Sequence, residues 1–427
     1  MKFAAIFVLL ANAFSAGMMF LASVFISRYG GKDLFGFFSV VLGVVVIGAK
    51  ISTLGLDVAI VRFLPEYRFK KLTAISAGMQ RFSLLITLGV SCAGAVAFAI
   101  LLHFVRGYDP FTAMTAALCL PMAAILAVLQ SVIRADANVS RAVVGEAIVR
   151  PACFAAGLLF AYFSVLGELT QPSVAISYLI ALVAAVLVVA ELVRRGNHIR
   201  WQERFAVTKS QIAVWMGHGV NLLLSESATA VINQAPIVLA GLLLSASEAG
   251  EMSAVIRLAM LVIFALTAVQ SVITPFLSRA MSRENQSELQ ALVARASGFA
   301  MLVALPVCCV FIVFANEFLS LFGEGYESAG PLLQVMLVGY LVYAAAGPAS
   351  GLLTMTGHHA IARTVVCCAA ATMIIGAGAA MQISGLSAGV WVSASVIAVY
   401  PILLAFFCKK LLGVDPTILS LRFLLKR

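Results

Sequence analysis

The stretch KISTLGLDVAIVRFLPEYR, residues 50–68, decides the fold class because a lysine and an aspartate lie within a segment that otherwise has the composition of a membrane-spanning helix. Placing Lys50 or Asp57 in hydrocarbon would cost about 3 kcal/mol each on insertion scales, so each should face protein or a watery cavity. On one continuous helix a polar stripe would contain Ser39, Gly43, Lys50, Thr53 and Asp57. Seven residues separate Lys50 from Asp57, which is roughly 10 Å along a helix axis and too far for a direct ion pair. Each side chain therefore needs its own partner or a ligand; alternatively, neighbouring helices satisfy both and the pair only holds the bundle together.

The composition of the whole chain is that of a polytopic membrane protein. Of its 427 residues, 63% are hydrophobic and 11% charged, and the mean hydropathy of +1.07 excludes an ordinary soluble domain of this size. The net charge of +10 fits cytoplasmic loops better than nucleic-acid binding, because no long basic run or stacking platform occurs. The eight cysteines lie in or beside apolar segments without a CxxC motif, so we interpret them as small core residues.

The distribution of apolar segments predicts an all-α integral membrane protein with about twelve spans. Their expected limits are 3–26, 35–61, 81–104, 111–133, 143–166, 172–195, 210–243, 249–278, 296–319, 330–354, 362–383 and 388–411. With the N-terminus in the cytoplasm, three of the 28 Lys and Arg residues lie outside and three within spans, which leaves 22 on the inner side. This asymmetry predicts that both termini are cytoplasmic.

Weak internal repetition predicts two six-helix bundles. Gly36 and Gly250 each open the second span of a half, and Arg81 and Arg295 each open the third, with both pairs 214 residues apart. Six spans per half give both copies the same orientation, related by a pseudo-two-fold axis along the membrane normal. The predicted parts are an N-terminal bundle at 1–195, a cytoplasmic linker at 196–209, and a C-terminal bundle with a basic tail at 210–427.

Further polar groups lie inside predicted spans. The seventh span carries His218, Asn221, Ser225, Thr229 and Asn233 within an arc of about 120°, with Glu226 at its edge. Arg257 lies in the eighth span and Arg150 in the fifth. Interhelical hydrogen bonds, or a structural pair of Glu226 with Arg257, are the alternatives to a functional role.

Signatures of catalysis and of cofactor binding do not occur in the sequence. We find no GxSxG, Walker A or HExxH motif, and the pair His358–His359 lies at a predicted inner turn. We therefore expect no catalytic residues, metal site or cofactor, and no enzyme activity. Any transport would draw on an ion gradient, the membrane potential or the flux of substrate.

Several motifs resemble polysaccharide exporters, especially O-antigen (Wzx-type) flippases, of the multidrug/oligosaccharidyl-lipid/polysaccharide (MOP) flippase superfamily. GLDVAIVRFLPEYR at 55–68 is similar to the end of their second span, and SVITPFLSRAMSRE at 271–284 to the matching place in their second half. INQAPIVLAGLLLSASEAGEMSAVIRLA at 232–259 and GEGY at 323–326 fit as well. The resemblance covers essentially the whole chain, although its motifs are loose.

The resemblance implies a V-shaped pair of bundles in the bacterial inner membrane that flips an undecaprenyl-pyrophosphate-linked oligosaccharide, an O-antigen or exopolysaccharide repeat unit, by alternating access. Related lipid II flippases keep cations in a central cavity to meet the pyrophosphate, and Lys50, Arg257 and Arg28 stand at plausible equivalents. A dianionic head crossing a low-dielectric region needs such compensating charge. We expect Lys50, Arg257, Arg28 and Arg150 to hold phosphate, and Asn221 and Ser225 to contact sugar.

Other roles and partners follow from the same pattern. The carboxylates of Asp57 and Glu226 differ from the purely cationic cavity of the related flippases. They either pair with the cations when the site is empty or bind H+ or Na+ for coupling. Anionic lipids, and a polysaccharide polymerase or other assembly protein, are expected partners. The alternative functions are a cation-coupled multidrug exporter of the same superfamily, a membrane-embedded glycan polymerase or ligase, and a scaffold.

Overall fold

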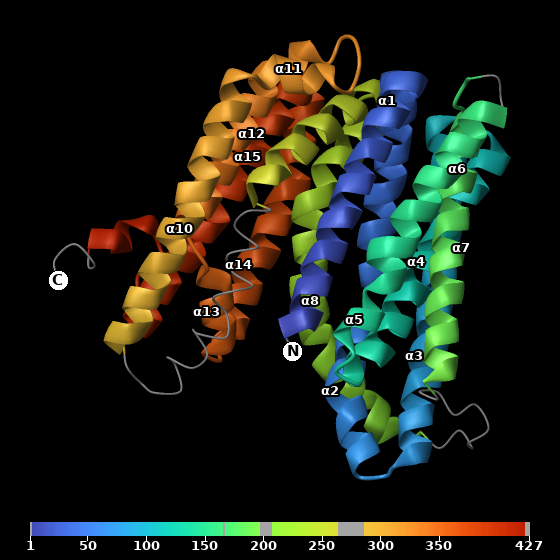
Figure 1. The fold of residues 1–427 in the computed structure, drawn as a ribbon, viewed down its shortest axis with the longest axis vertical. Helices are drawn as coiled ribbons and strands as arrows, with labels where there is room; N and C mark the ends of the chain where they lie inside the picture. The colour runs from blue at the N-terminus through green and yellow to red at the C-terminus, as the bar shows by residue number, and fades with distance from the viewer. Residues whose placement is uncertain (1, 165–166, 197–206, 264–285, 423–427) are drawn as a thin grey trace. The chain divides into compact units, whose positions relative to one another are not determined.

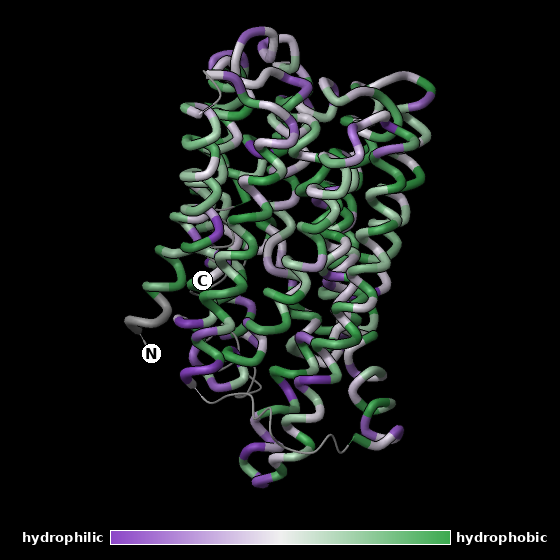
Figure 2. Tube along the Cα trace, turned by 90° about the vertical axis from the view of Figure 1, so that its right-hand side faces the viewer, coloured by the Kyte–Doolittle hydropathy of each residue, from purple (hydrophilic) through white to green (hydrophobic). Residues whose placement is uncertain are grey.

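The computed structural model of the protein describes residues 2–164, 167–196, 207–263 and 286–422, and all regular structure within these ranges is helical (Figure 1). Hydrophobic residues follow the helices along their length, and hydrophilic residues gather toward their ends (Figure 2). Nine apolar segments in the described ranges are long enough to cross a membrane: Ile6–Ser52, Thr73–Val105, Pro110–Ala135, Val139–Ser164, Gln171–Arg195, Lys209–Leu243, Gln286–Val313, Glu327–Met355 and His359–Leu412. The all-helical membrane fold is thereby confirmed.

Two of the nine segments are of double length, because the chain bends between two spans without losing helical hydrogen bonding. Helix α1 (Lys2–Ser52) breaks at Gly31, whose φ of 78° only glycine adopts readily. Helix α15 (Gly378–Leu412) breaks in the same way at Gly385, with φ 73°. The nine segments thus contain eleven of the predicted spans. The twelfth, predicted at 249–278, is helical over 246–263, and the rest of the predicted span lies outside the described residues.

Contacts between Cα atoms group the chain into two compact units, Met1–Ala230 and Val231–Arg427. The predicted division at the 196–209 linker stays a prediction, since residues 197–206 lie outside the described ranges. The helices of the first unit after α1 are α2 (Leu56–Phe69), α3 (Thr73–Ile100), α4 (Pro110–Ala135), α5 (Val139–Ala142), α6 (Arg150–Ser164), α7 (Gln171–Arg195) and the larger part of α8 (Lys209–Leu243). Single π-helical turns occur at η1 (Leu101–Val105) and η2 (Val144–Val149).

The core of the first unit forms around α4, which packs against α1, α2, α3 and α7. Asp109 starts α4 by accepting hydrogen bonds from the backbone N–H groups of Phe111 and Thr112. An aromatic cluster of Phe38, Phe154 and Tyr178 joins α1, α6 and α7, with ring centroids 5.0 to 5.6 Å apart. These rings are fully buried, so they fix α1 against the helices that carry Arg150 and Tyr178.

The predicted second span at 35–61 is not one continuous helix. Helix α1 ends at Ser52, Leu54 and Gly55 take left-handed φ values of 49° and 74°, and α2 begins at Leu56. The prediction of one polar stripe from Ser39 through Asp57 is therefore wrong beyond Ser52, because two left-handed residues turn the chain before Asp57.

The second unit contains α10 (Gln286–Val313), α11 (Ala315–Ser320), η3 (Glu327–Ala329), α12 (Gly330–Ala345), α13 (Ala349–Met355), α14 (His359–Thr372), η4 (Met373–Ala377), α15 and η5 (Ile418–Leu421). After α15 the chain folds back onto α10. The amide of Gln290 exchanges two hydrogen bonds with the backbone of Asp415, at 2.7 and 2.9 Å, and Ser297 donates to the carbonyl of Pro416.

The Asp415 carboxylate makes this returning segment sensitive to acid. Burial alone would raise its pKa, but hydrogen bonds from Thr417 and the ammonium of Lys409, 3.2 Å away, hold the pKa below its ordinary value of 3.8. A depressed pKa contributes stability that is present above 3.8 and is lost as pH falls through the folded value. We expect hydrogen exchange in residues 413–422 to accelerate below about pH 4. Asp415→Asn should remove this acid response, and an equal response in both proteins would contradict the assignment.

Candidate functional site

Lys50 lies between two carboxylates of the first unit. It occupies the last turn of α1, and its Nζ is 3.8 Å from Oδ2 of Asp57 on α2 and 3.6 Å from Oε2 of Glu226 on α8. The prediction that Lys50 and Asp57 are too far apart for an ion pair is wrong, because the break between α1 and α2 shortens the path. The Lys50 and Glu226 side chains are 37% and 58% exposed, so the ammonium is accessible rather than locked inside the bundle.

A pair of glycines brings the α1–α2 break against α8. A Cβ on Gly55 would lie 2.1 Å from the carbonyl oxygen of Gly219, so the two backbones touch where a side chain would stand. Glu226 lies two turns further along α8, about 10 Å away. The contact between Gly55 and Gly219 therefore fixes the helix that carries Glu226 beside the end of α1.

Thr53, in the break, connects Lys50 to Asp57. Its hydroxyl is 2.9 Å from the backbone carbonyl of Lys50 and 3.1 Å from Oδ1 of Asp57, and the residue is buried. One hydroxyl carries one proton, so Thr53 donates to one of these oxygens at a time.

The resemblance motif RFLPEYR, residues 62–68, makes packing contacts rather than lining the site. Arg68 forms an ion pair with Asp136 at the end of α4. The hydroxyl of Tyr67 accepts a hydrogen bond of 2.9 Å from the indole N–H of the buried Trp215 on α8. These contacts join α2 to α4 and α8, and they support the position of the α1–α2 break.

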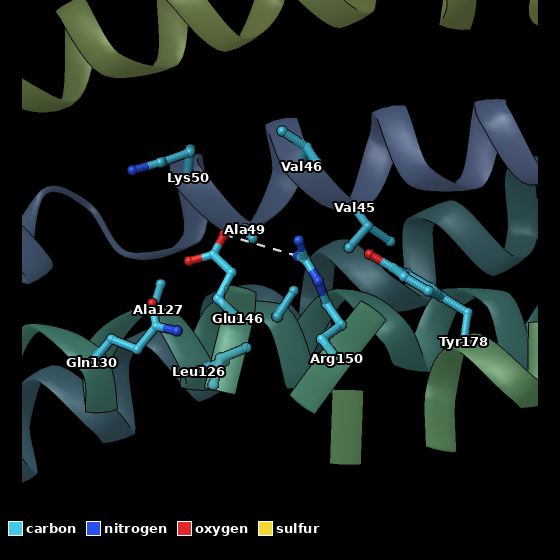
Figure 3. A pocket seen from close by; sticks show the side chains of 11 residues that line it. Val45, Val46, Ala49, Lys50, Leu126, Ala127, Gln130, Glu146, Arg150 and Tyr178 are labelled. Carbon is cyan, nitrogen blue, oxygen red and sulfur yellow. Dashed lines mark ion pairs between the residues drawn. The ribbon is translucent and has the colours of Figure 1, made fainter. Parts of the chain in front are cut away.

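A pocket of about 100 Å³ lies on the other side of the end of α1 (Figure 3). Its lining residues come from α1, α4, η2, α6 and α7, and are Val45, Val46, Ala49, Lys50, Ala123, Leu126, Ala127, Gln130, Glu146, Arg150 and Tyr178. Glu146 and Arg150 point toward one another, while the Lys50 ammonium points away from Arg150 (Figure 3). Two of the predicted phosphate ligands, Lys50 and Arg150, thus line one pocket.

The π-helical turn η2 places Glu146 and Arg150 in this pocket. Pro151, directly after Arg150, has no N–H and its ring clashes with the carbonyl four residues earlier in a regular α-helix, which favours the wider turn. The guanidinium Nη1 of Arg150 lies 3.9 Å from Oε1 of Glu146. At that distance the two charges attract each other without a hydrogen bond.

Two N–H donors in the pocket are uncommitted. Gln130 is 1% exposed, and its Oε1 accepts a hydrogen bond of 3.3 Å from Nη2 of Arg134. Nε2 of Gln130 and Nε of Arg150 are buried, and no described residue supplies either with a hydrogen-bond acceptor.

Three residues that line the pocket were not predicted from the sequence: Gln130, Glu146 and Tyr178. Glu146 carried a usable signal, because it is an ionisable residue inside the predicted span 143–166. Gln130 lies near the end of the span 111–133, where a polar residue is ordinary, and Tyr178 looks like any interior aromatic.

The other predicted site residues lie apart from this pocket or in the second unit. Arg28 is exposed just before the break at Gly31, about 30 Å along α1 from Lys50, and does not line the pocket. Arg257 belongs to the second unit, where its Nε donates to the hydroxyl of Ser253 at 3.2 Å. The backbone carbonyl of Ser225 accepts from Thr229, and the side chain of Asn221 lies outside what the structure describes.

Residues 4–281, about two thirds of the chain, match the family described as polysaccharide biosynthesis protein. The chain belongs to this family. Residues 222–380 also match the MatE family, and this match overlaps the first over residues 222–281. A comparison with curated protein sequences found no match.

Solved structures place this polysaccharide biosynthesis family member in the MOP fold. An inward-facing multidrug resistance MATE transporter of the MOP superfamily superposes with a TM-score of 0.75 at 16% identity, over 93% of this chain and 94% of that one. The lipid II flippase MurJ, in an inward closed conformation, gives 0.70 at 14% identity over 95% and 87%. A MOP transporter from Pyrococcus furiosus, described as having a binding pocket of reverse polarity, gives 0.64 at 15% identity over 96% and 95%. The chain therefore has the fold of MOP-superfamily transporters, and its long apolar helices are those of a multi-pass membrane protein.

Proposed function

We propose that this protein is a flippase that moves an undecaprenyl-pyrophosphate-linked oligosaccharide, such as an O-antigen or exopolysaccharide repeat unit, across the bacterial inner membrane. The observation that carries the proposal is the pair of cations, Lys50 and Arg150, that line one pocket in a polysaccharide biosynthesis family member. A pyrophosphate that crosses the bilayer needs positive charge to compensate its own negative charge. Cations inside a membrane protein are energetically costly, so their presence indicates a functional role.

Within this proposal each candidate residue has a role. Lys50 and Arg150 meet the phosphates in the N-terminal unit, Arg257 does so from the C-terminal unit, and Arg28 acts near the outer mouth. Asn221 and Ser225 on α8 contact sugar. Alternating access would come from one half rocking against the other about the 196–209 linker, with both termini in the cytoplasm, and a polysaccharide polymerase would receive the product.

Asp57 and Glu226 act as internal partners of Lys50 in the proposed cycle. Both carboxylates lie within 4 Å of the ammonium, so they balance its charge when no phosphate is bound. When phosphate takes their place beside the Lys50 ammonium, the two carboxylates become free to bind H+ or Na+. This would couple transport to an ion gradient.

A reconstituted flipping assay tests the proposal. Proteoliposomes loaded with a fluorescent lipid-linked oligosaccharide from the same bacterium should show transfer of the glycan between leaflets, measured by quenching with a membrane-impermeant reagent. Empty liposomes and liposomes with heat-inactivated protein are the controls. No transfer above these controls, in protein that remains folded, would contradict the proposal.

A cation-coupled drug exporter is the second candidate, because the Lys50 site also contains two carboxylates and the fold is shared with multidrug MATE transporters. Proteoliposomes that export a cationic dye with an imposed ion gradient, but do not flip the lipid-linked glycan, would favour it. Lengthened glycan products in the same assay would instead indicate a polymerase.

A further inference from the structure

The pocket beside Arg150 has hydrogen-bond donors that lack acceptors. Gln130 is almost completely buried, and its Nε2 has no acceptor among the described residues; the same is true of Nε of Arg150. Proteins rarely leave buried donors unsatisfied, because the loss of water is then uncompensated. The pocket therefore has the donor set of a site for a ligand with acceptor oxygens.

Arg134 fixes the direction of the Gln130 donor. Its Nη2 donates to Oε1 of Gln130, so the amide oxygen is occupied and the amide nitrogen is the group left for the pocket. A glutamine held in this way presents a donor with a set orientation. This arrangement distinguishes Gln130 from a glutamine that can turn its oxygen toward a cation.

Charge and size select the class of ligand. Among the pocket-lining residues, Lys50 and Arg150 are cations and Glu146 is the one carboxylate. An arginine edge suits a tetrahedral oxyanion, because its planar donors match the spacing of two oxygens. The volume of about 100 Å³ gives room for one phosphoryl group.

We propose that the pocket formed by Gln130 and Arg150, with Lys50 at its edge, is a subsite for a single phosphoryl group, and that Gln130 is the positioning donor. The inference rests on the proposed function for the source of the phosphoryl group, which is either the lipid carrier or a free anion. Binding of phosphate at this pocket does not depend on the protein being a flippase. Glu146 opposes the anion, so its charge limits how tightly the site binds.

Binding of inorganic phosphate and inorganic pyrophosphate to the purified full-length protein tests the subsite. Calorimetric titration at constant ionic strength, with chloride as the comparison anion, should show binding of phosphate but not of chloride. Gln130→Met keeps the shape and removes the donor, and should weaken binding roughly tenfold. Arg150→Met should weaken binding roughly 10- to 100-fold, whereas Glu146→Gln should tighten it.

Gln80→Met is the matched control, since Gln80 on α3 is as buried as Gln130 but does not line the pocket. It should leave phosphate affinity unchanged. Should Gln130→Met not fold, Gln130→Glu keeps the volume and replaces the donor with a carboxylate, and it should abolish binding. Equal binding of chloride, no binding of phosphate, or equal affinities in the Gln130 and Gln80 variants would overturn the proposal.

Competition with undecaprenyl pyrophosphate separates the two sources. Displacement of phosphate by the lipid carrier supports a headgroup subsite, and its absence supports a site for the free anion; both retain the proposed subsite. If phosphate binds as expected but the protein does not flip a lipid-linked glycan, the proposed function fails and the subsite stands.

Discussion

Lys50→Met is expected to reduce surface polysaccharide at least about tenfold, because removing a charged hydrogen-bond partner of a ligand costs about 1.5–3 kcal/mol. The change also leaves Asp57 and Glu226 without the ammonium that lies 3.8 and 3.6 Å from them. Two unbalanced carboxylates would repel an entering pyrophosphate. The measurement is lectin or antibody labelling of surface glycan in cells that carry the variant as the only copy, with protein level checked by immunoblot.

A matched control and a compensated variant sharpen this test. Lys70→Met removes a lysine that is also ion-paired, with Glu66 at 2.6 Å, but is exposed at the end of α2, and export should not change. Lys50→Met combined with Asp57→Asn and Glu226→Gln removes the unbalanced carboxylates. If Lys50 binds phosphate, the triple variant stays defective. Restored export in the triple variant would mean that Lys50 only neutralises the two acids.

Gly55→Ala is expected to destabilise the folded protein more than any other substitution proposed here. Gly55 has a φ of 74°, and an added Cβ would lie 2.1 Å from the backbone oxygen of Gly219. The left-handed conformation alone disfavours alanine by roughly 1 kcal/mol, and a backbone oxygen cannot move away as a side chain can. The midpoint of thermal unfolding in detergent should fall, and the yield of monodisperse protein with it.

Gly217→Ala is the control for the glycine experiment. Gly217 lies on α8, two residues before Gly219, and an added Cβ there has open space around it. Alanine favours a helix over glycine by roughly 1 kcal/mol, so this variant should be as stable as the natural protein or more so. An unfolding midpoint for Gly55→Ala equal to that of the natural protein would show that the backbones need not touch.

The number of spans and the helical membrane class could be predicted because they depend on long apolar segments. The free-energy cost of exposing such a segment to water follows from its composition alone. The local geometry around Lys50 could not. An ideal helix from residue 35 to 61 places Asp57 roughly 10 Å along the axis from Lys50, whereas Leu54 and Gly55 break the helix and bring both charges together. Ala-Lys-Ile-Ser-Thr-Leu-Gly, residues 49–55, contains only one glycine, which is a weak signal for a break.

The candidate site was only partly accessible from sequence for a similar reason. Arg150 was predicted as an intramembrane charge and Glu146 was not, although it carries the same signal; their convergence on one pocket depends on the π-helical turn before Pro151. Gln130 joins them from α4 by tertiary packing, which no local pattern encodes. The positions of Arg257 and Arg28 relative to a phosphate remain predictions.

The placement of Lys50 between two carboxylates has a consequence for turnover. A carrier that bound a pyrophosphate with unpaired cations would release it slowly, since each departing phosphate would leave an unbalanced positive charge behind. Here Asp57 and Glu226 are near enough to recapture the ammonium as the phosphate departs. In the proposed cycle the two acids would act as exchangeable counter-ions, which would lower the barrier to unloading at the expense of affinity.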